Sequence, residues 1–490
     1  MSDFTTYLPP ELIDKVLSYL NVKEIGFFSQ VSVNWREASN RDSVWLHHCM
    51  KNGWMKYGIS GSILHEEPSA KPTTNISGTS PHFDLYGEYL NEEPSAKPTT
   101  NVSGTSPHFN LYGEYLNEEP SAKPTTNVSG TSPHFDLYVP FDTRLSPICK
   151  WKHVYLRMYH LTRNWEKGRF FVSPTLRGHS QRVTAIDSNG TCLVSGSEDK
   201  TLVTWNMLTG SKIYTVHCHS DAVTAIKIQG HHIITGCADS AVRVFRIDNG
   251  DLEFSLFGHS GSVDHLGVSD HDYIISAGSD RTVRVWSSSE RKLLRMFHAH
   301  TDEIECMHCC GHMILTCSWD KLMVLYHVEN DNPIQVLEGH SEAVSCCQFD
   351  EYKVVSGSAD SDLRIWETSS GYCTHVLEGH TGEVYCLVYN KHVIASGASD
   401  STIRIWSHSG ECQYVLTGHL GIVRCLYIND HRLVSGGDQK KIGIWNFKTG
   451  KLMNMVHRCP SLLHLMWVGE TKIVTASPES TGTITIINFW

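Results

Sequence analysis

The feature that most constrains the fold of this chain is a period of about 40 residues that begins at His179 and runs toward the C-terminus. Each unit opens with a histidine, and an aspartate follows 20 or 21 residues later. An aromatic residue stands six residues beyond the aspartate. Short alternating apolar segments and small-residue turns separate these marks, which is typical of β-strands joined by tight turns. A period of this length predicts an array of similar units.

Six units carry all three marks, and the seventh carries two of them. The histidines are His179, His219, His259, His300, His340, His380 and His419; the aspartates are Asp199, Asp239, Asp280, Asp320, Asp360 and Asp400; the aromatics are Trp205, Phe245, Trp286, Tyr326, Trp366, Trp406 and Trp445. The seventh unit has Gln439 at the aspartate position, with Asp438 one place early. These marks resemble WD40 repeats, and the resemblance implies that a strand hydroxyl joins each set, from Ser195, Thr235, Ser276, Thr316, Ser356 and Ser396. One His–Asp–Ser set per unit beneath an aromatic favours a satisfied structural network over a hydrolase triad.

The resemblance to WD40 repeats covers about 312 residues. The resemblance implies an all-β propeller over residues 169–490. An eighth unit lacks the histidine at Arg458-Cys459-Pro460 and has Thr481 and Ile487 where aspartate and tryptophan are expected. Terminal units are often atypical, and residues 169–176 resemble an outer strand that closes the last blade. We therefore expect eight blades, with seven as the alternative if the last unit does not fold as a blade.

The segment 66–142 contains near-identical copies of a 26-residue sequence, EEPSAKPTTNISGTSPHFDLYGEYLN in its first form. Proline, serine, threonine and glycine dominate each copy, which predicts a disordered linker. The alternative is a short repeat array, or a gene-model artefact. Each copy has one small apolar cluster, which is too little for a core of its own.

The N-terminal block reads LPPELIDKVLSYL, followed by VSVNWREASNRDSVWLHHC. Its LPxEL opening, V-S-x-x-W element and late Val-Trp resemble the F-box, so we assign residues 6–52 to a small all-α F-box. The resemblance implies binding to Skp1, the adaptor of cullin-based ubiquitin ligases, and through it to cullin and RING subunits. The residues that would meet the adaptor are Leu8, Pro9, Leu12, Ile13, Val16 and Leu17. The alternative, an ordinary small helical core, is compatible with adaptor binding.

Apolar residues recur at helical spacing between the linker and the propeller, from Trp151 to Trp165. They predict an amphipathic connecting helix over residues 148–168, similar to the stalk of F-box/WD-repeat proteins.

Binding positions on the propeller follow from the same resemblance, because family members bind around the entrance of one face. The substrate-binding candidates are Arg182, Asp264, Glu303, Glu305, Trp319, Tyr385 and Arg424. Some relatives bind phosphorylated segments with several arginines, but only Arg182 and Arg424 are available here, and we expect them near each other. The far side of the entrance is acidic. Such a mixed surface favours a peptide with a basic stretch, which can also carry one acidic or phosphorylated residue held by Arg424. The alternative is that these are plain loop residues.

The composition excludes several function classes. A net charge of −11 argues against nucleic-acid binding. No apolar run is long enough to span a membrane, and the N-terminus has no signal-peptide pattern, so we expect a location in the cytoplasm or nucleus. Cys306-x-x-Cys309 has no second cysteine pair nearby, which favours packed thiols over a metal site. We expect no metal and no cofactor.

We therefore expect the substrate-recognition subunit of an SCF-type ubiquitin ligase, with no catalytic residues of its own. The alternative is a non-degradative WD40 scaffold. Only seven residues precede Leu8. That leaves no room for the dimerising segment of some relatives, so we expect a monomer within the complex.

Overall fold

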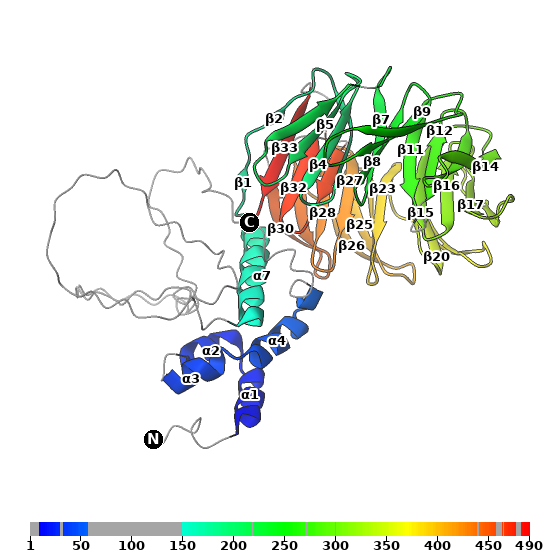
Figure 1. Ribbon diagram of the computed structural model, residues 1–490. Helices are drawn as coiled ribbons and strands as arrows, with labels where there is room; N and C mark the ends of the chain where they lie inside the picture. Colours follow the sequence, from blue (N-terminus) through cyan, green and yellow to red (C-terminus); the bar gives the residue numbers. More distant parts are fainter. Residues whose placement is uncertain are drawn as a thin grey trace, which may run out of the picture. The chain divides into compact units, whose positions relative to one another are not determined.

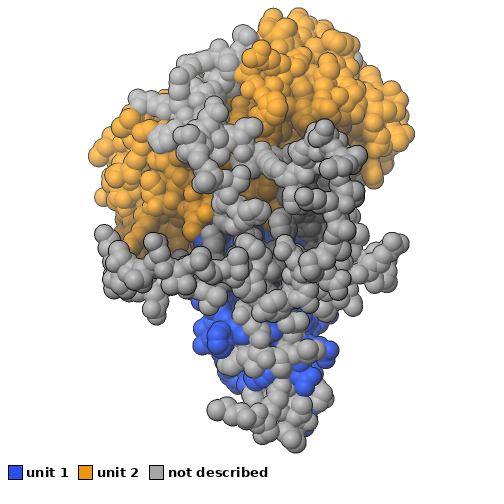
Figure 2. Space-filling view, turned by 90° about the vertical axis from the view of Figure 1, so that its left-hand side faces the viewer, with its two compact units in different colours: residues 1–163 blue, residues 164–490 orange. Residues whose placement is uncertain are grey.

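The chain is described here from a computed structural model, which covers residues 9–29, 33–56, 149–217, 219–269, 273–298, 300–438, 441–456, 463, 465–476 and 482–490. The predicted linker repeats and Leu8 lie outside these residues. Contacts divide the chain into two compact units, Met1–Arg163 and Asn164–Trp490 (Figure 2). Within the described residues, no helix is both long and apolar enough to cross a bilayer.

The first unit is helical (Figure 1). Its helices are α1 (Pro10–Tyr19), α2 (Val22–Phe28), α3 (Val33–Ser39), α4 (Asp42–Lys51) and the first part of α7 (Lys150–Lys167). A proline in the first turn starts α1, where the missing amide hydrogen costs nothing. A capping box of Asn21 and Glu24 starts α2. Asp14 joins α1 to α4, because its carboxylate accepts from Arg41 Nη1 at 3.0 Å and from Ser43 Oγ.

Helix α7 takes part in the core of this unit. The Trp151 amide donates to Asp42 Oδ1 at 3.1 Å, at the start of α4. The Tyr155 ring lies 5.2 Å from that of Trp45 and 5.0 Å from that of Trp54, centroid to centroid. In this part of the predicted apolar stripe, Val154, Tyr155, Met158 and Leu161 are buried and Trp151 is partly buried. Trp165 belongs to the second unit and stacks on Phe489.

The second unit consists of eight antiparallel sheets, which we number as blades from the N-terminal side. The first four blades are β3 (Val183–Ser188), β4 (Cys192–Ser197), β5 (Leu202–Asn206) and β6 (Lys212–Val216); β7 (Val223–Gln229), β8 (His232–Cys237), β9 (Ala241–Arg246) and β10 (Leu252–Phe257); β11 (Val263–Val268), β12 (Tyr273–Gly278), β13 (Thr282–Ser287) and β14 (Lys292–His298); and β15 (Ile304–Cys310), β16 (Met313–Ser318), β17 (Met323–His327) and β18 (Gln335–Leu337).

The next three blades repeat this order from the inner strand to the outer strand. They are β19 (Val344–Phe349), β20 (Lys353–Ser358), β21 (Leu363–Glu367) and β22 (Cys373–Leu377); β23 (Val384–Tyr389), β24 (Ile394–Ala398), β25 (Ile403–Trp406) and β26 (Cys412–Leu416); and β27 (Val423–Ile428), β28 (Leu433–Gly437), β29 (Ile442–Asn446) and β30 (Lys451–Val456).

The eighth blade closes the ring with strands from both ends of the repeat region. Its inner strands are β31 (Leu465–Val468), β32 (Lys472–Ala476) and β33 (Thr483–Asn488), and both β1 (Phe171–Val172) and β2 (Leu176–Arg177) pair with β33. In the eighth blade Ile487 pairs with Ile473. Trp286 of the third blade pairs with Ile274 at the equivalent position, so Ile487 stands where other blades have tryptophan. The ring therefore has eight blades, and the seven-blade alternative is wrong.

The hydrophobic core lies between neighbouring blades. Val203 and Leu193 of the first blade share a buried cluster with Ile484 and Val474 of the eighth, and the other clusters likewise join adjacent blades. The inner strand β31 contacts β3 of the first blade and β27 of the seventh. Each blade thus buries one face against each neighbour, which is why a single repeat cannot fold alone.

Candidate functional site

The His–Asp sets are structural in five of the first six blades. His340 is representative: its Nδ1 lies 2.8 Å from Asp360 Oδ2, and its Nε2 lies 2.8 Å from Ser356 Oγ. The Trp366 indole N–H donates to the same hydroxyl at 2.9 Å. Because that serine already bonds two buried groups, it is not an available nucleophile.

The His–Asp and His–hydroxyl bonds recur in four other blades, and the indole bond recurs in three of them. The Nδ1-to-carboxylate distances are 3.2 Å for His179–Asp199, 2.8 Å for His259–Asp280, 3.0 Å for His300–Asp320 and 2.9 Å for His380–Asp400. These histidine side chains are fully buried, and burial lowers their pKa. The carboxylates accept backbone and side-chain hydrogen bonds, which lower their pKa although burial alone would raise it.

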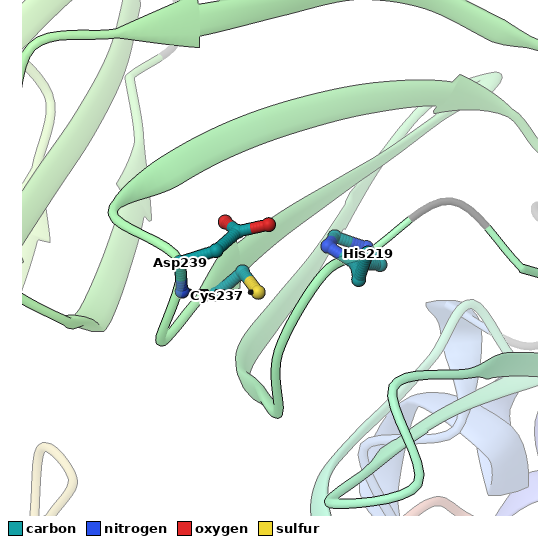
Figure 3. A group of neighbouring side chains, drawn as sticks. All are labelled: His219, Cys237 and Asp239. Atoms are coloured by element: carbon teal, nitrogen blue, oxygen red, sulfur yellow. Dashed lines mark hydrogen bonds between the residues drawn. The ribbon is translucent and has the colours of Figure 1, made fainter.

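The second blade departs from this pattern. His219 Nδ1 lies 3.0 Å from Arg243 Nη1, and Arg243 also pairs with Asp239 at 2.8 Å. Cys237 lies beside them, so His219, Cys237 and Asp239 form a candidate metal-ligand group (Figure 3). The guanidinium, however, already contacts both the imidazole nitrogen and the carboxylate that a cation would need. The chemistry of this group therefore disfavours metal binding.

We call the end of the ring that carries the histidine and aspartate turns the entry face. One backbone hydrogen bond recurs on this face. The amide of the residue before the buried aspartate donates to the carbonyl of the residue before the inner strand, as Trp319 N does to Glu303 O at 3.1 Å. The equivalent bond in the seventh blade runs from Asp438 N to Ile422 O at 3.0 Å. Asp438 thus takes the position of Trp319 on the entry face, and it does not replace the buried aspartate of the other blades.

The second residue of each inner strand has one of two roles. Thr184, Thr224 and Ser345 donate from their hydroxyl to the carbonyl of Val223, Val263 and Val384, the first inner-strand residue of the next blade. Asp264, Glu305, Tyr385 and Arg424 hold the same position with longer, mostly charged side chains. In the third blade His265 makes the link instead, from Nε2 to the Ile304 carbonyl at 3.0 Å. Four predicted site residues thus hold equivalent positions at the start of their inner strands.

Trp319, Glu303 and Glu305 come together on the fourth blade. The Trp319 indole N–H donates to Glu305 Oε2 at 2.8 Å, while 52% of the tryptophan remains exposed. On the neighbouring blade, Ser262 Oγ donates to Asp264 Oδ1 at 2.6 Å. These two blades offer three carboxylates beside an exposed aromatic surface.

Both predicted arginines are already paired. Arg424 Nε donates to Asp438 Oδ1 at 2.9 Å, and its guanidinium lies 5.4 Å from the Tyr385 ring centroid. The Tyr385 hydroxyl donates to Glu383 Oε2 at 2.8 Å, which raises its pKa. Arg182 Nη1 lies 3.9 Å from Glu198 Oε1. Asp438 is not among the predicted site residues, although its early position in the repeat was the signal for this pairing.

The two arginines lie on different blades. Arg182 belongs to the first blade and Arg424 to the seventh, so the eighth blade stands between them. They are therefore not on neighbouring blades.

The predicted adaptor face divides into exposed and buried residues. Pro9 is exposed, and Leu12 and Val16 are 48% and 42% exposed. Ile13 and Leu17 are buried in the core of the helical unit, which corrects their assignment as contact residues. Tyr19 is exposed and extends the stripe formed by Leu12 and Val16 at helical spacing. Its exposure could not be read from the sequence, because it follows from which face of α1 packs on α3 and α4.

Comparison with known families matches both parts of the chain. Residues 5–51 match the F-box-like model. The model of the WD domain, G-beta repeat, matches seven times, over residues 172–206, 210–246, 250–287, 291–327, 331–367, 371–407 and 410–446.

Similar proteins include two fungal proteins described as "Probable E3 ubiquitin ligase complex SCF subunit sconB". The Aspergillus terreus protein is 37% identical over 227 residues, which cover 44% of this chain and 32% of that protein. The Aspergillus niger protein is 26% identical over 223 residues, 43% of this chain and 32% of that protein. The chain therefore spans about a third of the length of these relatives. Among solved structures, the computationally designed Ika8 protein superposes with a TM-score of 0.61 at 26% identity, covering 64% of this chain and 98% of the designed chain.

Proposed function

Because the chain belongs to the WD40-repeat family and carries an F-box-like region before its propeller, we propose that it is the substrate-recognition subunit of an SCF-type ubiquitin ligase. The observation that carries this proposal is the combination of a helical unit with an exposed apolar stripe and an eight-bladed propeller with a charged entry face. The description of the fungal relatives as SCF subunits supports it.

In this proposal the stripe of Pro9, Leu12, Val16 and Tyr19 on α1 binds the Skp1 adaptor. Half-exposed aliphatic side chains in one row are costly to leave in water, and covering them contributes roughly 1 kcal/mol per side chain. Ile13 and Leu17 support the stripe from within the helical core. Skp1 in turn brings the cullin and RING subunits.

The entry face binds the protein to be ubiquitinated. Asp264, Glu303 and Glu305 give the third and fourth blades an acidic character, and Trp319 adds an exposed aromatic anchor. The two arginines are offset by Glu198 and Asp438. This distribution favours a substrate segment that contains lysine or arginine over a multiply phosphorylated one.

The chain makes and breaks no covalent bond in this mechanism. It raises the effective concentration of substrate lysines near the charged conjugating enzyme, which is a matter of positioning. The buried His–Asp–Ser sets take no part, because their hydrogen bonds are used within the blades.

The second candidate is a WD40 scaffold that does not lead to degradation. It uses the same entry face, and it differs in having no adaptor bound to α1. Adaptor binding therefore discriminates the two functions.

The deciding experiment is co-purification of the full chain with Skp1, comparing wild type with the Leu12→Ala/Val16→Ala double variant. Tyr352→Ala is the control, since it removes a large exposed side chain from the propeller (77% exposed). Binding by wild type and control with loss in the double variant supports the ligase role. If the wild type does not bind Skp1, the scaffold function is the candidate that remains.

A further inference from the structure

Three thiols meet between the inner parts of the fourth and fifth blades. Cys306 lies on β15 and Cys347 on β19, and their Sγ atoms are 3.8 Å apart. Cys317 lies opposite Cys306 across the β15–β16 ladder. None of these cysteines is in a disulfide.

The third thiol is a departure from the repeat. Blades five, six and seven place glycine opposite the cysteine of the inner strand, in the pairs Cys346–Gly357, Cys386–Gly397 and Cys425–Gly436. Only the fourth blade, among those with a cysteine at this position, pairs it with a second cysteine. The thiol cluster is therefore specific to one blade interface and is not a consequence of the repeat.

The interface holds the sulfur atoms in a fixed apolar setting. Cys317 is fully buried and Cys347 is 7% exposed, within a cluster that includes Leu315, Leu325 and Phe349. Cys306 lies at the edge of this cluster and is partly exposed. Of the three cysteines, Cys306 is thus the one that is partly exposed, while packing holds the Cys347 sulfur in contact with its own.

The neighbours of Cys306 also set its acidity. Hydrogen bonds with Cys317 and Cys347, aided by His265, lower its pKa well below the usual value. Burial instead raises the pKa of the equivalent Cys346, Cys386 and Cys425. Thiolate character and partial exposure together determine which cysteine reacts first.

We propose that Cys306 and Cys347 form an oxidisable dithiol whose reactant is a hydroperoxide. The Cys306 thiolate attacks the peroxide oxygen, so that the O–O bond breaks, a sulfenic acid forms at Cys306, and the leaving hydroxide takes a proton to become water. The Cys347 sulfur then attacks the Cys306 sulfur, and the sulfenic oxygen departs as a second water. Overall, two thiols and one hydrogen peroxide give one disulfide and two waters.

The disulfide would join β15 to β19 directly below the entry face. Glu305 immediately precedes Cys306, and Ser345 lies two residues before Cys347. Oxidation therefore fixes the spacing of two inner strands that carry entry-face residues. This modification site does not depend on the proposed ligase role.

Peptide mapping of the full chain tests the site. The reduced protein is treated with graded hydrogen peroxide, its remaining thiols are alkylated, and it is digested with trypsin without reduction. Trypsin cleaves after Arg295, Lys321 and Lys353, so Cys306 falls in peptide 296–321 and Cys347 in peptide 322–353. We expect these two peptides to become cross-linked, and to separate on reduction.

Matched variants identify the bond. Cys309→Ser and Cys346→Ser change a neighbouring cysteine in the same two peptides and should keep the cross-link, whereas Cys306→Ser or Cys347→Ser should lose it. If a variant does not fold, fragment ions of the wild-type cross-linked pair locate the bond without any substitution. A bond through Cys317 or Cys346, or no cross-link while exposed Cys412 is oxidised, would overturn the proposal.

Discussion

Arg424 donates from Nε to the Asp438 carboxylate across 2.9 Å, and the two side chains are only 24% and 18% exposed. The pair joins the inner strand β27 of the seventh blade to the turn after β28. Its partner ring, Tyr385, comes from the sixth blade. The Asp438 carboxylate offsets the charge of the guanidinium, so the charge of Arg424 alone overstates the affinity of this face for phosphate.

Removing the Asp438 carboxylate should increase the affinity of the entry face for phosphate. We expect Asp438→Asn to tighten binding of a phosphoserine peptide several-fold, with a stronger dependence on salt than the wild type. Fluorescence anisotropy of the peptide and its unphosphorylated form measures this. Asp251→Asn is the control, because it removes an exposed carboxylate from a different blade, the second. Tight wild-type binding that Arg424→Ala abolishes would show that the phosphate mode operates after all.

The shared serine of a blade network predicts a large loss of stability. Ser356→Ala leaves both Trp366 Nε1 and His340 Nε2 without their buried partner, which should lower the free energy of unfolding by about 1–3 kcal/mol. Ser341→Ala is the control, because only the backbone amide of that residue bonds to Asp360. Thermal and urea unfolding of the full chain measure the difference. Equal effects of the two substitutions would contradict the network.

Much of this fold follows from the sequence, because the marks of the repeat are the residues that make each blade. Even the atypical eighth unit keeps an apolar residue, Ile487, in the tryptophan register. The different hydrogen bonds of the second blade could not be predicted from the sequence, since they depend on Arg243 contacting both His219 and Asp239.

The candidate site was less predictable than the fold. Helical spacing placed Leu12, Ile13, Val16 and Leu17 together, but only the packing of α1 separates the exposed pair from the buried pair. Strand register likewise decides that Asp438 meets Arg424. Sequence patterns indicate which positions face a surface, while pairing between those positions depends on geometry.

The histidine without an aspartate predicts a pH dependence. His419 Nε2 lies 2.8 Å from Ser435 Oγ, while its Nδ1 has no partner among the described residues. Burial, aided by Lys441, lowers its pKa from 6.5 to about 4. Between these values the unfolded chain binds a proton that the folded chain does not, so stability falls as the pH drops through this window, by about 3 kcal/mol.

We therefore expect His419→Gln to be less stable than the wild type near neutral pH and to lose less stability on acidification. Thermal midpoints at a series of pH values from about 7 to about 4 measure the slopes. The exposed His231→Gln is the control and should keep the wild-type slope. An unchanged slope in His419→Gln would assign the pH dependence to other groups, of which His219 is the first to examine, because its pKa is also lowered to about 4.

Trp319 combines an exposed ring with a hydrogen bond to Glu305. If the fourth blade binds a lysine- or arginine-containing segment, the ring provides a cation–π surface and the carboxylate provides the charge. On an array of peptides with graded basic content, wild-type binding should increase with lysine and arginine. Trp319→Ala should reduce it about tenfold, a loss of ~1.4 kcal/mol, and Trp319→Phe should reduce it less. Tyr352→Ala should have no effect. A preference for acidic peptides, or an unchanged profile in Trp319→Ala with an intact fold, would place recognition on other blades.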